Sequence, residues 1–340
     1  MGNTIEMQVF PYSPQWHFRL LDYMRKVYPY RSAEYLDWWL GNIDAAGKVC
    51  WEKCVIVVLD DDTIVGCTTA NMAKLTIGND KKDWFLRGNT IISPDQRGKG
   101  ISKGLYEFVN GYDNWLSVGI TDIAWKIQPK YVRNFTPIQP IRIYIAVNLW
   151  VVGQFLRKLF GLQGNTKKDF VIPGQIDISK KNSFVRVQDV SEINVPESGR
   201  WTVDKVELVR DKNYFEKRFF DIYCAKRYGL YKYINDGELA GYVVLRKMCY
   251  AGLDMVAVVD YRFMDKTNER LAFAVANKLA RKNNIGIVFG MSSRNYNVFG
   301  GPLLLHARKI LNCAVGTKGI DFSDMLVTSA DSDLDFVYYH

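Results

Sequence analysis

Residues 83–112 read DWFLRGNTIISPDQRGKGISKGLYEFVNGY, and they contain the pattern that decides the fold. The apolar run from Trp84 to Ile92 is typical of a β-strand and ends at a Ser-Pro pair. A cationic segment broken by glycines follows at 97–100, and helical periodicity begins at Ser102. The order of strand, basic glycine loop and helix predicts an anion-binding loop.

This loop has the composition of a pyrophosphate site. Gly98 and Gly100 allow backbone N–H groups to turn toward one point, and the helix that follows adds unpaired N–H groups and the positive end of its dipole. Arg97 and Lys99 bring positive charge to the same point. The alternative is a plain basic turn between a strand and a helix. The complete order of elements favours the anion site.

The segment Arg97-Gly98-Lys99-Gly100-Ile101-Ser102 resembles the R-x-x-G-x-G/A pyrophosphate loop of the GNAT family of acetyl-CoA-dependent N-acyltransferases. It departs from that pattern at Ser102, where the family has Gly or Ala; serine is small and a good helix N-cap. The resemblance implies acetyl-CoA (coenzyme A) as the cofactor, with backbone contacts from the end of the preceding strand. The residues that it implies as cofactor-binding are Ile91, Ile92, Ser93, Arg97, Gly98, Lys99, Gly100, Ile101 and Ser102.

Residues 1–140 contain the elements expected of one acetyl-CoA-binding GNAT domain. The periodicity predicts a strand at 6–10, helices at 14–27 and 32–42, a hairpin of strands 55–59 and 64–70, the strand and helix around the loop, and a strand at 120–127. This order is the one that the resemblance implies for the cofactor half of the fold.

Residues 183–340 repeat this order without the glycine loop. The pattern predicts a helix at 214–226, a hairpin of strands 230–235 and 240–248 around Asp236-Gly237, a strand at 255–261, a helix at 267–282 and a strand at 285–291. The turn before that last helix reads Arg262-Phe263-Met264-Asp265-Lys266, and its carboxylate would repel a phosphate. This half resembles the degenerate second domain of tandem GNAT proteins.

The predicted fold class is therefore α/β (α+β), with two GNAT-like domains, each a mixed, mostly antiparallel twisted sheet flanked by helices. Residues 141–182 are predicted to form an apolar linker helix and a polar connector. The fourteen uncharged residues between Arg142 and Arg157 are too few to span a bilayer. Two interpretations of this segment remain: a linker helix buried against both domains, or an interfacial helix over 143–160 that makes a peripheral membrane contact.

Composition narrows the class of partner. Hydrophobic residues make up 48% and charged residues 24%, which excludes a disordered chain. The 45 Lys and Arg exceed the 36 Asp and Glu, so the net charge of +9 favours anionic partners. The loop indicates a phosphorylated cofactor, and we do not expect a nucleic acid. The six scattered cysteines predict reduced thiols and no metal site. Reduced thiols are typical of a cytoplasmic protein, and this is the location that we expect. If residues 143–160 bind lipid, the protein would contact the inner face of the membrane.

Candidate catalytic residues are few. Acyl transfer from a thioester to an amine needs a neutral amine, a stabilised oxyanion and a protonated leaving thiolate. Glu34 and Asp260 are the candidates for the general base, and each also suits a solvated or structural carboxylate. The resemblance implies that a tyrosine protonates the leaving sulfur, and Tyr131 is the candidate. The run Asp331–Asp335 suits either a cationic acceptor or a solvated tail.

The resemblance implies an acyl-CoA-dependent N-acetyltransferase that transfers the acyl group directly to an amine acceptor. The acceptor is expected to be a small-molecule or saccharide amine, and the resemblance suggests an amino sugar in bacterial surface-polysaccharide synthesis. Two alternatives remain: an aminoacyl-tRNA-dependent transferase of the peptidoglycan-bridge type, and a non-catalytic scaffold that binds CoA. The sequence leaves the oligomeric state open.

Overall fold

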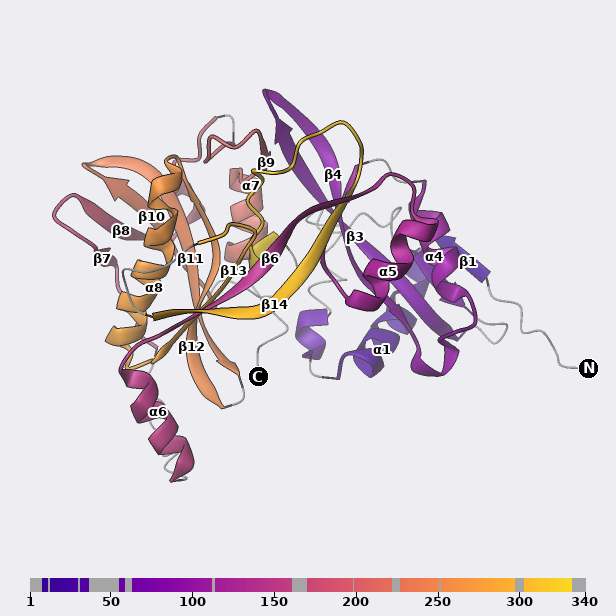
Figure 1. The fold of residues 1–340 in the computed structure, drawn as a ribbon, viewed down its shortest axis with the longest axis horizontal. Coiled ribbons are helices and arrows are strands. Elements are labelled where there is room, and N and C mark those ends of the chain that lie inside the picture. The colour runs from indigo at the N-terminus through magenta and orange to yellow at the C-terminus, as the bar shows by residue number, and fades with distance from the viewer. Residues whose placement is uncertain are drawn as a thin grey trace, which may run out of the picture. The chain divides into compact units, whose positions relative to one another are not determined.

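The computed structural model describes residues 8–11, 13–29, 31–36, 55–58, 63–111, 114–160, 170–197, 199–221, 227–250, 252–296 and 303–331. The chain forms two compact units (Figure 1). Unit 1 comprises 1–139 and 311–323, and unit 2 comprises 140–310 and 324–340. The chain passes from one unit to the other within β6 (Phe135–Val147), within β14 (Leu303–Gly316) and after Ser323.

Unit 1 is a mixed, mostly antiparallel sheet with helices. Its strands are ordered β1-β2-β3-β4-β5-β14, and of the pairs for which a register is defined only β4 with β5 is parallel. The elements not yet defined are β1 (Gln8–Pro11), η1 (Pro14–Trp16), α1 (His17–Val27), β2 (Val55–Val58), β3 (Ile64–Ile77), β4 (Asp80–Ile92), η3 (Pro94–Gln96), α4 (Ile101–Val109), β5 (Trp115–Ile120) and α5 (Asp122–Tyr131).

One face of α4 is buried against the strands of unit 1. Ile101 and Leu105 are buried in one cluster with Val65 of β3. Tyr106 and Val109 are buried in a second cluster, with Trp115 of β5. Residues at positions i, i+4, i+5 and i+8 of a helix share a face, so the sequence of α4 alone determines which side contacts the sheet.

In unit 2 the strands are ordered β6-β13-β12-β11-β10-β8-β7, and of the pairs for which a register is defined only β12 with β13 is parallel. The elements not yet defined are α6 (Trp150–Leu159), β7 (Gln175–Asp177), β8 (Asn182–Val187), η4 (Val190–Glu192), β9 (Val206–Leu208), α7 (Lys212–Phe215), the π-helical η5 (Glu216–Phe220), β10 (Gly229–Asn235), β11 (Glu238–Tyr250), β12 (Leu253–Phe263), η6 (Lys266–Arg270), α8 (Leu271–Lys282), β13 (Ile287–Ser292) and η7 (Ser329–Asp331).

Both units contain an antiparallel hairpin, a third strand antiparallel to it, a helix, and a strand parallel to the third. In unit 1 these are β2, β3, β4, α4 and β5, and in unit 2 they are β10, β11, β12, α8 and β13. Asp236 and Gly237 at the hairpin turn have φ of 52° and 89°, as a two-residue turn of this kind requires. The predicted fold class is therefore confirmed.

The strand predicted at 120–127 is wrong. β5 ends at Ile120, and Thr121 begins α5 because its Oγ1 accepts a hydrogen bond from the N–H of Ala124 at 3.3 Å. A short apolar run allows either assignment, and here the N-cap decides it.

The linker predicted at 141–182 is not a separate segment of the structure. Residues 142–147 belong to β6 and pair with β13, so the apolar run is divided between a buried strand and α6. β7 also falls within 141–182, and all of these residues belong to unit 2. Residues 303–311 belong to β14. Of the helix predicted at 32–42, residues 37–42 lie outside the described part of the chain.

Candidate functional site: the loop between β4 and α4

The loop backbone has the conformation that the sequence predicts. Gly98 and Gly100 both have φ of 83°, in the left-handed region that favours glycine. Gly100 is the N-cap of α4, and no side chain caps this helix end. A Cβ added at either glycine would meet no atom within 4 Å, so there is open space beside the loop. The first N–H groups of α4 have no partner within the helix and can donate to a ligand in that space.

Two exposed cations lie on the same loop. Nε of Arg97 donates to the carbonyl of Ile92 at 3.3 Å, and Nζ of Lys99 donates to Oε1 of Gln96 at 2.9 Å. Both acceptors are neutral, so these contacts orient the positive charges without cancelling them. The loop therefore offers backbone donors and two cations to an anion.

The C-terminal part of β4 has backbone N–H and C=O groups that do not pair with β5. The parallel pairing covers only Phe85–Arg87 with Trp115–Ser117, whereas β4 continues to Ile92. The N–H of Ser93 donates to Val65 of β3 at 2.8 Å. Because alternate residues of a strand face opposite neighbours, Ile92 directs its N–H and C=O away from β3. In the described ladder, β5 pairs with none of residues 88–92, so this edge can bond to an extended ligand.

A β-bulge interrupts the same strand. Cys67 pairs with Ile91 and Thr69 with Gly88, so Thr68 faces two residues of β4, Asn89 and Thr90. The hydroxyls of Thr68 and Thr90 lie 2.9 Å apart, and that of Thr68 also donates to the carbonyl of Gly88 at 3.4 Å. A bulge changes the direction of the backbone groups that follow it, and bulges are frequent beside active sites.

Tyr23 of α1 was not a candidate from its sequence context, yet it lies beside β3. Its hydroxyl donates to the carbonyl of Val65 at 3.2 Å. Burial raises the pKa of Tyr23, while nearby Ser93 and Arg97 act in the opposite direction. Burial also raises the pKa of Cys67 to about 12, so this thiol stays neutral and is not a nucleophile. Within the helical periodicity of α1, Tyr23 is indistinguishable from a core residue.

The candidates Tyr131 and Glu34 lie on helices. Tyr131 is the last residue of α5 and packs, half-buried, against the cluster that contains Trp115 and Val132. Glu34 is exposed in the helical turn that begins where Oγ of Ser32 accepts from the N–H of Tyr35 at 3.1 Å. The catalytic roles of Tyr131 and Glu34 stay predictions.

Asp260, the third candidate, lies in the core of unit 2 and not at an open cleft. It is fully buried, and its carboxylate contacts Nε of Arg210 at 2.9 Å and Nη1 of Arg262 at 2.8 Å. The hydroxyls of Tyr242 and Thr328 each donate to it at 2.8 Å. Burial alone would raise its pKa, but the two arginines outweigh burial and lower the pKa of Asp260 to about 2. This environment suits a structural carboxylate.

Asp331 belongs to the same network, although the sequence suggested a solvated tail or a surface for a cationic acceptor. It is buried, its Oδ1 pairs with Nη2 of Arg210, and its Oδ2 lies 3.6 Å from Nη2 of Arg262. Two arginines thus hold two carboxylates inside unit 2. Residues 332–335 of the acidic run lie outside the described part of the chain.

The helix of unit 2 that corresponds to α4 has its own carboxylate at its entrance. Oδ1 of Asp265 accepts from the N–H of Thr267 at 2.8 Å and caps η6, which leads into α8. The backbone and side-chain hydrogen bonds of Thr267 lower the pKa of Asp265. A carboxylate at this position occupies the donors that the glycine loop leaves open in unit 1.

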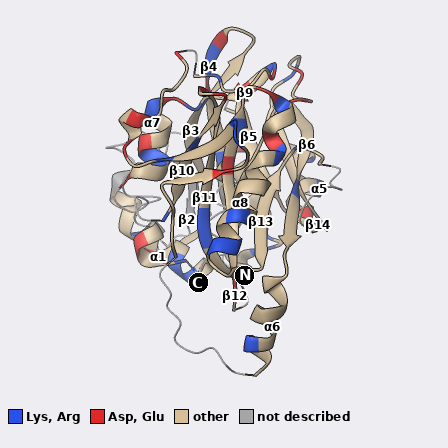
Figure 2. Cartoon of the chain, turned by 90° about the vertical axis from the view of Figure 1, so that its left-hand side faces the viewer, with Lys and Arg blue, Asp and Glu red and all other residues tan. Residues whose placement is uncertain are grey.

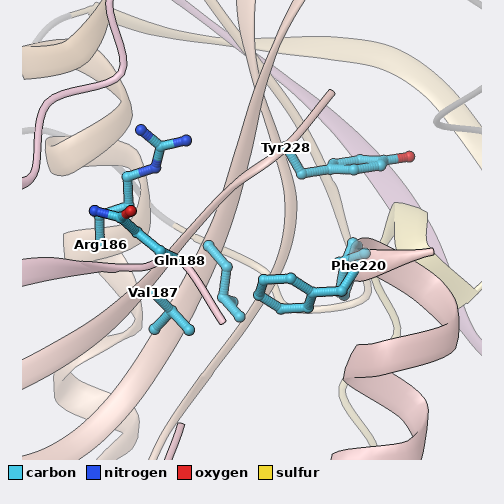
Figure 3. A pocket seen from close by; sticks show the side chains of 7 residues that line it. Arg186, Val187, Gln188, Phe220 and Tyr228 are labelled. Carbon is cyan, nitrogen blue, oxygen red and sulfur yellow. The ribbon is translucent and has the colours of Figure 1, made fainter. Parts of the chain in front are cut away.

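Unit 2 also contains a small cavity of about 130 Å³. Residues 186–188 lie on one side of it and face Phe220 and Tyr228 on the other (Figure 3). The hydroxyl of Tyr228 accepts from Nη1 of both Arg218 and Arg246, at 3.1 and 3.3 Å. Sites for drug-sized ligands usually have volumes of roughly 300–1,000 Å³, so this cavity is too small to hold a coenzyme.

No protein-family model matches the sequence. No curated protein matches it either.

Solved structures match its fold. A protein of Enterococcus faecalis V583, described as a probable N-acyltransferase, superposes with a TM-score of 0.55 at 12% identity over 91% of this chain and 72% of that one. A GCN5-related N-acetyltransferase of Anabaena variabilis gives a TM-score of 0.55 at 11% identity, with the same coverage of 91% and 72%. The N-myristoyltransferase of Saccharomyces cerevisiae with bound myristoyl-CoA gives 0.51 at 12% identity over 86% and 74%.

The chain therefore has an N-acyltransferase fold. More particularly, the fold is that of the GCN5-related N-acetyltransferases, as the loop between β4 and α4 predicted, and the N-myristoyltransferase shares it. At these identities the likeness concerns the fold.

Proposed function

We propose that the chain is an acyl-CoA-dependent N-acyltransferase, with acetyl-CoA as donor, and that unit 1 binds the cofactor. The observation that carries the proposal is the pair of left-handed glycines before the uncapped N-terminus of α4. The likeness of the fold to N-acyltransferases supports it. The alternative that needs aminoacyl-tRNA gives this loop no function.

The residues of the site suit coenzyme A. Backbone N–H groups of 98–102, with Arg97 and Lys99, would hold its pyrophosphate. The edge of β4 over 88–92 would hydrogen-bond the amides of the pantetheine arm, as a sheet edge binds an extended peptide. When bound, the cofactor supplies an acyl group activated as a thioester.

The chain itself would then supply three functions. Backbone N–H groups at the bulge of β4 would stabilise the negative charge that develops on the carbonyl oxygen. The exposed carboxylate of Glu34 would be the base for the amine, and the hydroxyl of Tyr131 would donate a proton to the leaving sulfur. The buried network around Asp260 supports unit 2 and takes no part in the proton transfers.

The acceptor proposed is a small-molecule or saccharide amine, such as an amino sugar of a bacterial surface polysaccharide. Mass spectrometry of reactions with amino sugars and acetyl-CoA would detect the N-acetyl product. Release of free CoA with no amine acylated would instead indicate hydrolysis, and binding without release of CoA would favour the scaffold.

Thermal unfolding with acetyl-CoA, myristoyl-CoA, free CoA and tRNA tests the choice of cofactor. A ligand at about 100 times its Kd should stabilise the folded chain by roughly 2.7 kcal/mol, and we expect this shift with acetyl-CoA. Free CoA should also stabilise the protein, since it carries the same pyrophosphate. A shift with tRNA alone would overturn the proposal.

The two loop cations should contribute to affinity through their charge. The double variant Arg97→Gln, Lys99→Gln is expected to bind acetyl-CoA about 10-fold more weakly, with the difference shrinking at high salt. Lys81→Gln with Lys82→Gln is the control, because these exposed residues at the far end of β4 remove equal charge. Titrations at two salt concentrations measure both. An equal loss in the control would mean that only the net charge matters.

A further inference from the structure

Helix α6 of unit 2 exposes an unusual amount of apolar surface. Leu149, Val152, Phe155, Leu156, Leu159 and Phe160 recur at spacings that place them on one helical face. All six are exposed, from 48% for Leu156 to 91% for Leu149. Soluble proteins rarely expose contiguous apolar patches, and such patches usually mark an interaction surface. We call these six residues the α6 face.

The protein contacts the opposite side of the helix. Gln154 lies opposite the α6 face and donates through Nε2 to the carbonyl of Asp254 at 3.3 Å, while its Oε1 accepts from the N–H of Gly286 at 3.0 Å. The polar side chain therefore faces unit 2 and the apolar ones face outward, the reverse of an ordinary surface helix.

The base of α6 is held firmly in unit 2. Oδ1 of Asn148 accepts from the N–H of Trp150 at 3.0 Å, and its Nδ2 donates to Asn277 and to the carbonyl of Ile285, both at 3.1 Å. A Cβ on Gly286 would come within 2.1 Å of the backbone N of Val151, so the helix packs directly on this glycine. In Figure 1, α6 extends beyond the end of the sheet of unit 2. These contacts hold the start of α6 against unit 2, while the α6 face stays exposed.

The charges around the α6 face select its partner. From Pro140 to Lys168 the sequence has five Lys or Arg residues and no Asp or Glu. Arg157 is exposed and flanks the α6 face, and Lys158 follows it in the sequence. Figure 2 shows charge on α6 only near its C-terminal end, where it is positive. An apolar face beside cations complements an anionic lipid surface, which would repel acidic side chains. Binding of a protein partner would not by itself exclude Asp and Glu from this segment.

We propose that the α6 face docks the protein on an anionic phospholipid membrane, with α6 inserted into the headgroup and acyl boundary. A helix of 10 residues is about 15 Å long and a bilayer core about 30 Å thick, so α6 would enter the membrane without crossing it. No helix in the described part of the chain is long and apolar enough to cross a membrane. Trp150, 44% exposed at the start of α6, is a residue type enriched at membrane interfaces.

Flotation of the full chain with vesicles tests this docking. Wild type should bind vesicles of phosphatidylcholine mixed with phosphatidylglycerol more strongly than phosphatidylcholine alone. Phe155→Gln with Leu159→Gln should lower the partition coefficient about 100-fold on both, because two apolar side chains no longer insert. Arg157→Gln with Lys158→Gln should lower it about 30-fold on the anionic vesicles and little on the neutral ones.

Phe18→Gln is the matched control, since Phe18 on α1 of unit 1 is 79% exposed. This variant should bind vesicles as wild type does, and an equal loss would overturn the proposal. Wild type that binds neither vesicle would also overturn it. Light scattering without vesicles identifies the rival occupant: a dimer that Phe155→Gln with Leu159→Gln dissociates, together with no vesicle binding, would assign the α6 face to a second copy of the chain.

Discussion

Gly100→Val is expected to weaken acetyl-CoA binding at least about 100-fold. A β-branched residue strongly disfavours the φ of 83° at this position, so the backbone rotates and the N–H groups of Ile101 and Ser102 turn away from the site. Each hydrogen bond to a charged group contributes about 1.5–3 kcal/mol, and the loss of two accounts for the expected change. Isothermal titration calorimetry measures the affinity of both proteins.

Gly78→Val separates binding from backbone strain. Gly78 also has a positive φ, of 60°, with open space beside it, in the turn between β3 and β4 of the same unit. Both variants should lose about 1–2 kcal/mol of unfolding free energy, because a left-handed backbone costs that much outside glycine. Only Gly100→Val should lose affinity. Equal affinities in the two variants would place the cofactor elsewhere.

Asp260→Ala should lower the unfolding free energy by about 3–5 kcal/mol, because it leaves Arg210 and Arg262 buried without one of their carboxylates. Asp254→Ala is the control on the same strand. Asp254 pairs with Lys247 at 3.0 Å near the surface, and such a pair contributes about 0–1 kcal/mol. Urea denaturation of the two variants measures the difference, and similar losses would contradict the assignment of Asp260 to the core.

The stability due to Asp260 also depends on pH. Its pKa is lowered from 3.8 to about 2 in the folded protein, so the contribution is fully present above about pH 4 and is lost as pH falls toward 2. Asp260→Asn keeps the shape and removes the titration. We expect its unfolding free energy to fall less steeply with acid in this range than that of wild type. If the unfolding free energies of wild type and Asp260→Asn fell equally with acid, Asp260 would not be held ionised in the folded protein.

The sequence was most informative where a backbone conformation depends on residue type. Gly98 and Gly100 predicted a loop whose backbone N–H groups turn toward one point, and Asp236-Gly237 predicted the hairpin turn; all four residues have a positive φ, which few other residue types adopt. The order of strand, glycine loop and helix around residues 84–109 then predicted the fold. These signals are local, and each lies within a few residues of the feature that it predicts.

The predictions that were wrong missed either a local cap or a partner that is distant in the sequence. The segment 120–127 has the apolar content of a strand, and the cap at Thr121 makes it a helix. The run after Arg142 became a strand because β13 pairs with it, from about 140 residues further along the chain. Asp260 looked like a candidate base because nothing nearby in the sequence reveals Arg210 or Asp331.

Part of the site could not be predicted for a different reason. The edge of β4 and its bulge arise from how the ladders with β3 and β5 begin and end, and no side chain marks them. The donors proposed at the bulge are backbone groups, which every residue except proline possesses. A glycine loop is therefore easier to recognise from residue type than the backbone groups that would act on a cofactor.

Amide hydrogen exchange of the wild-type chain with and without acetyl-CoA tests the central claim most directly. We predict slower exchange in peptides that cover residues 88–105, where the β4 edge, the loop and the start of α4 would donate to the cofactor. Peptides that cover 262–270 of unit 2 should not change, because Asp265 caps that helix. No protection at 88–105, or protection at 262–270 instead, would contradict the account.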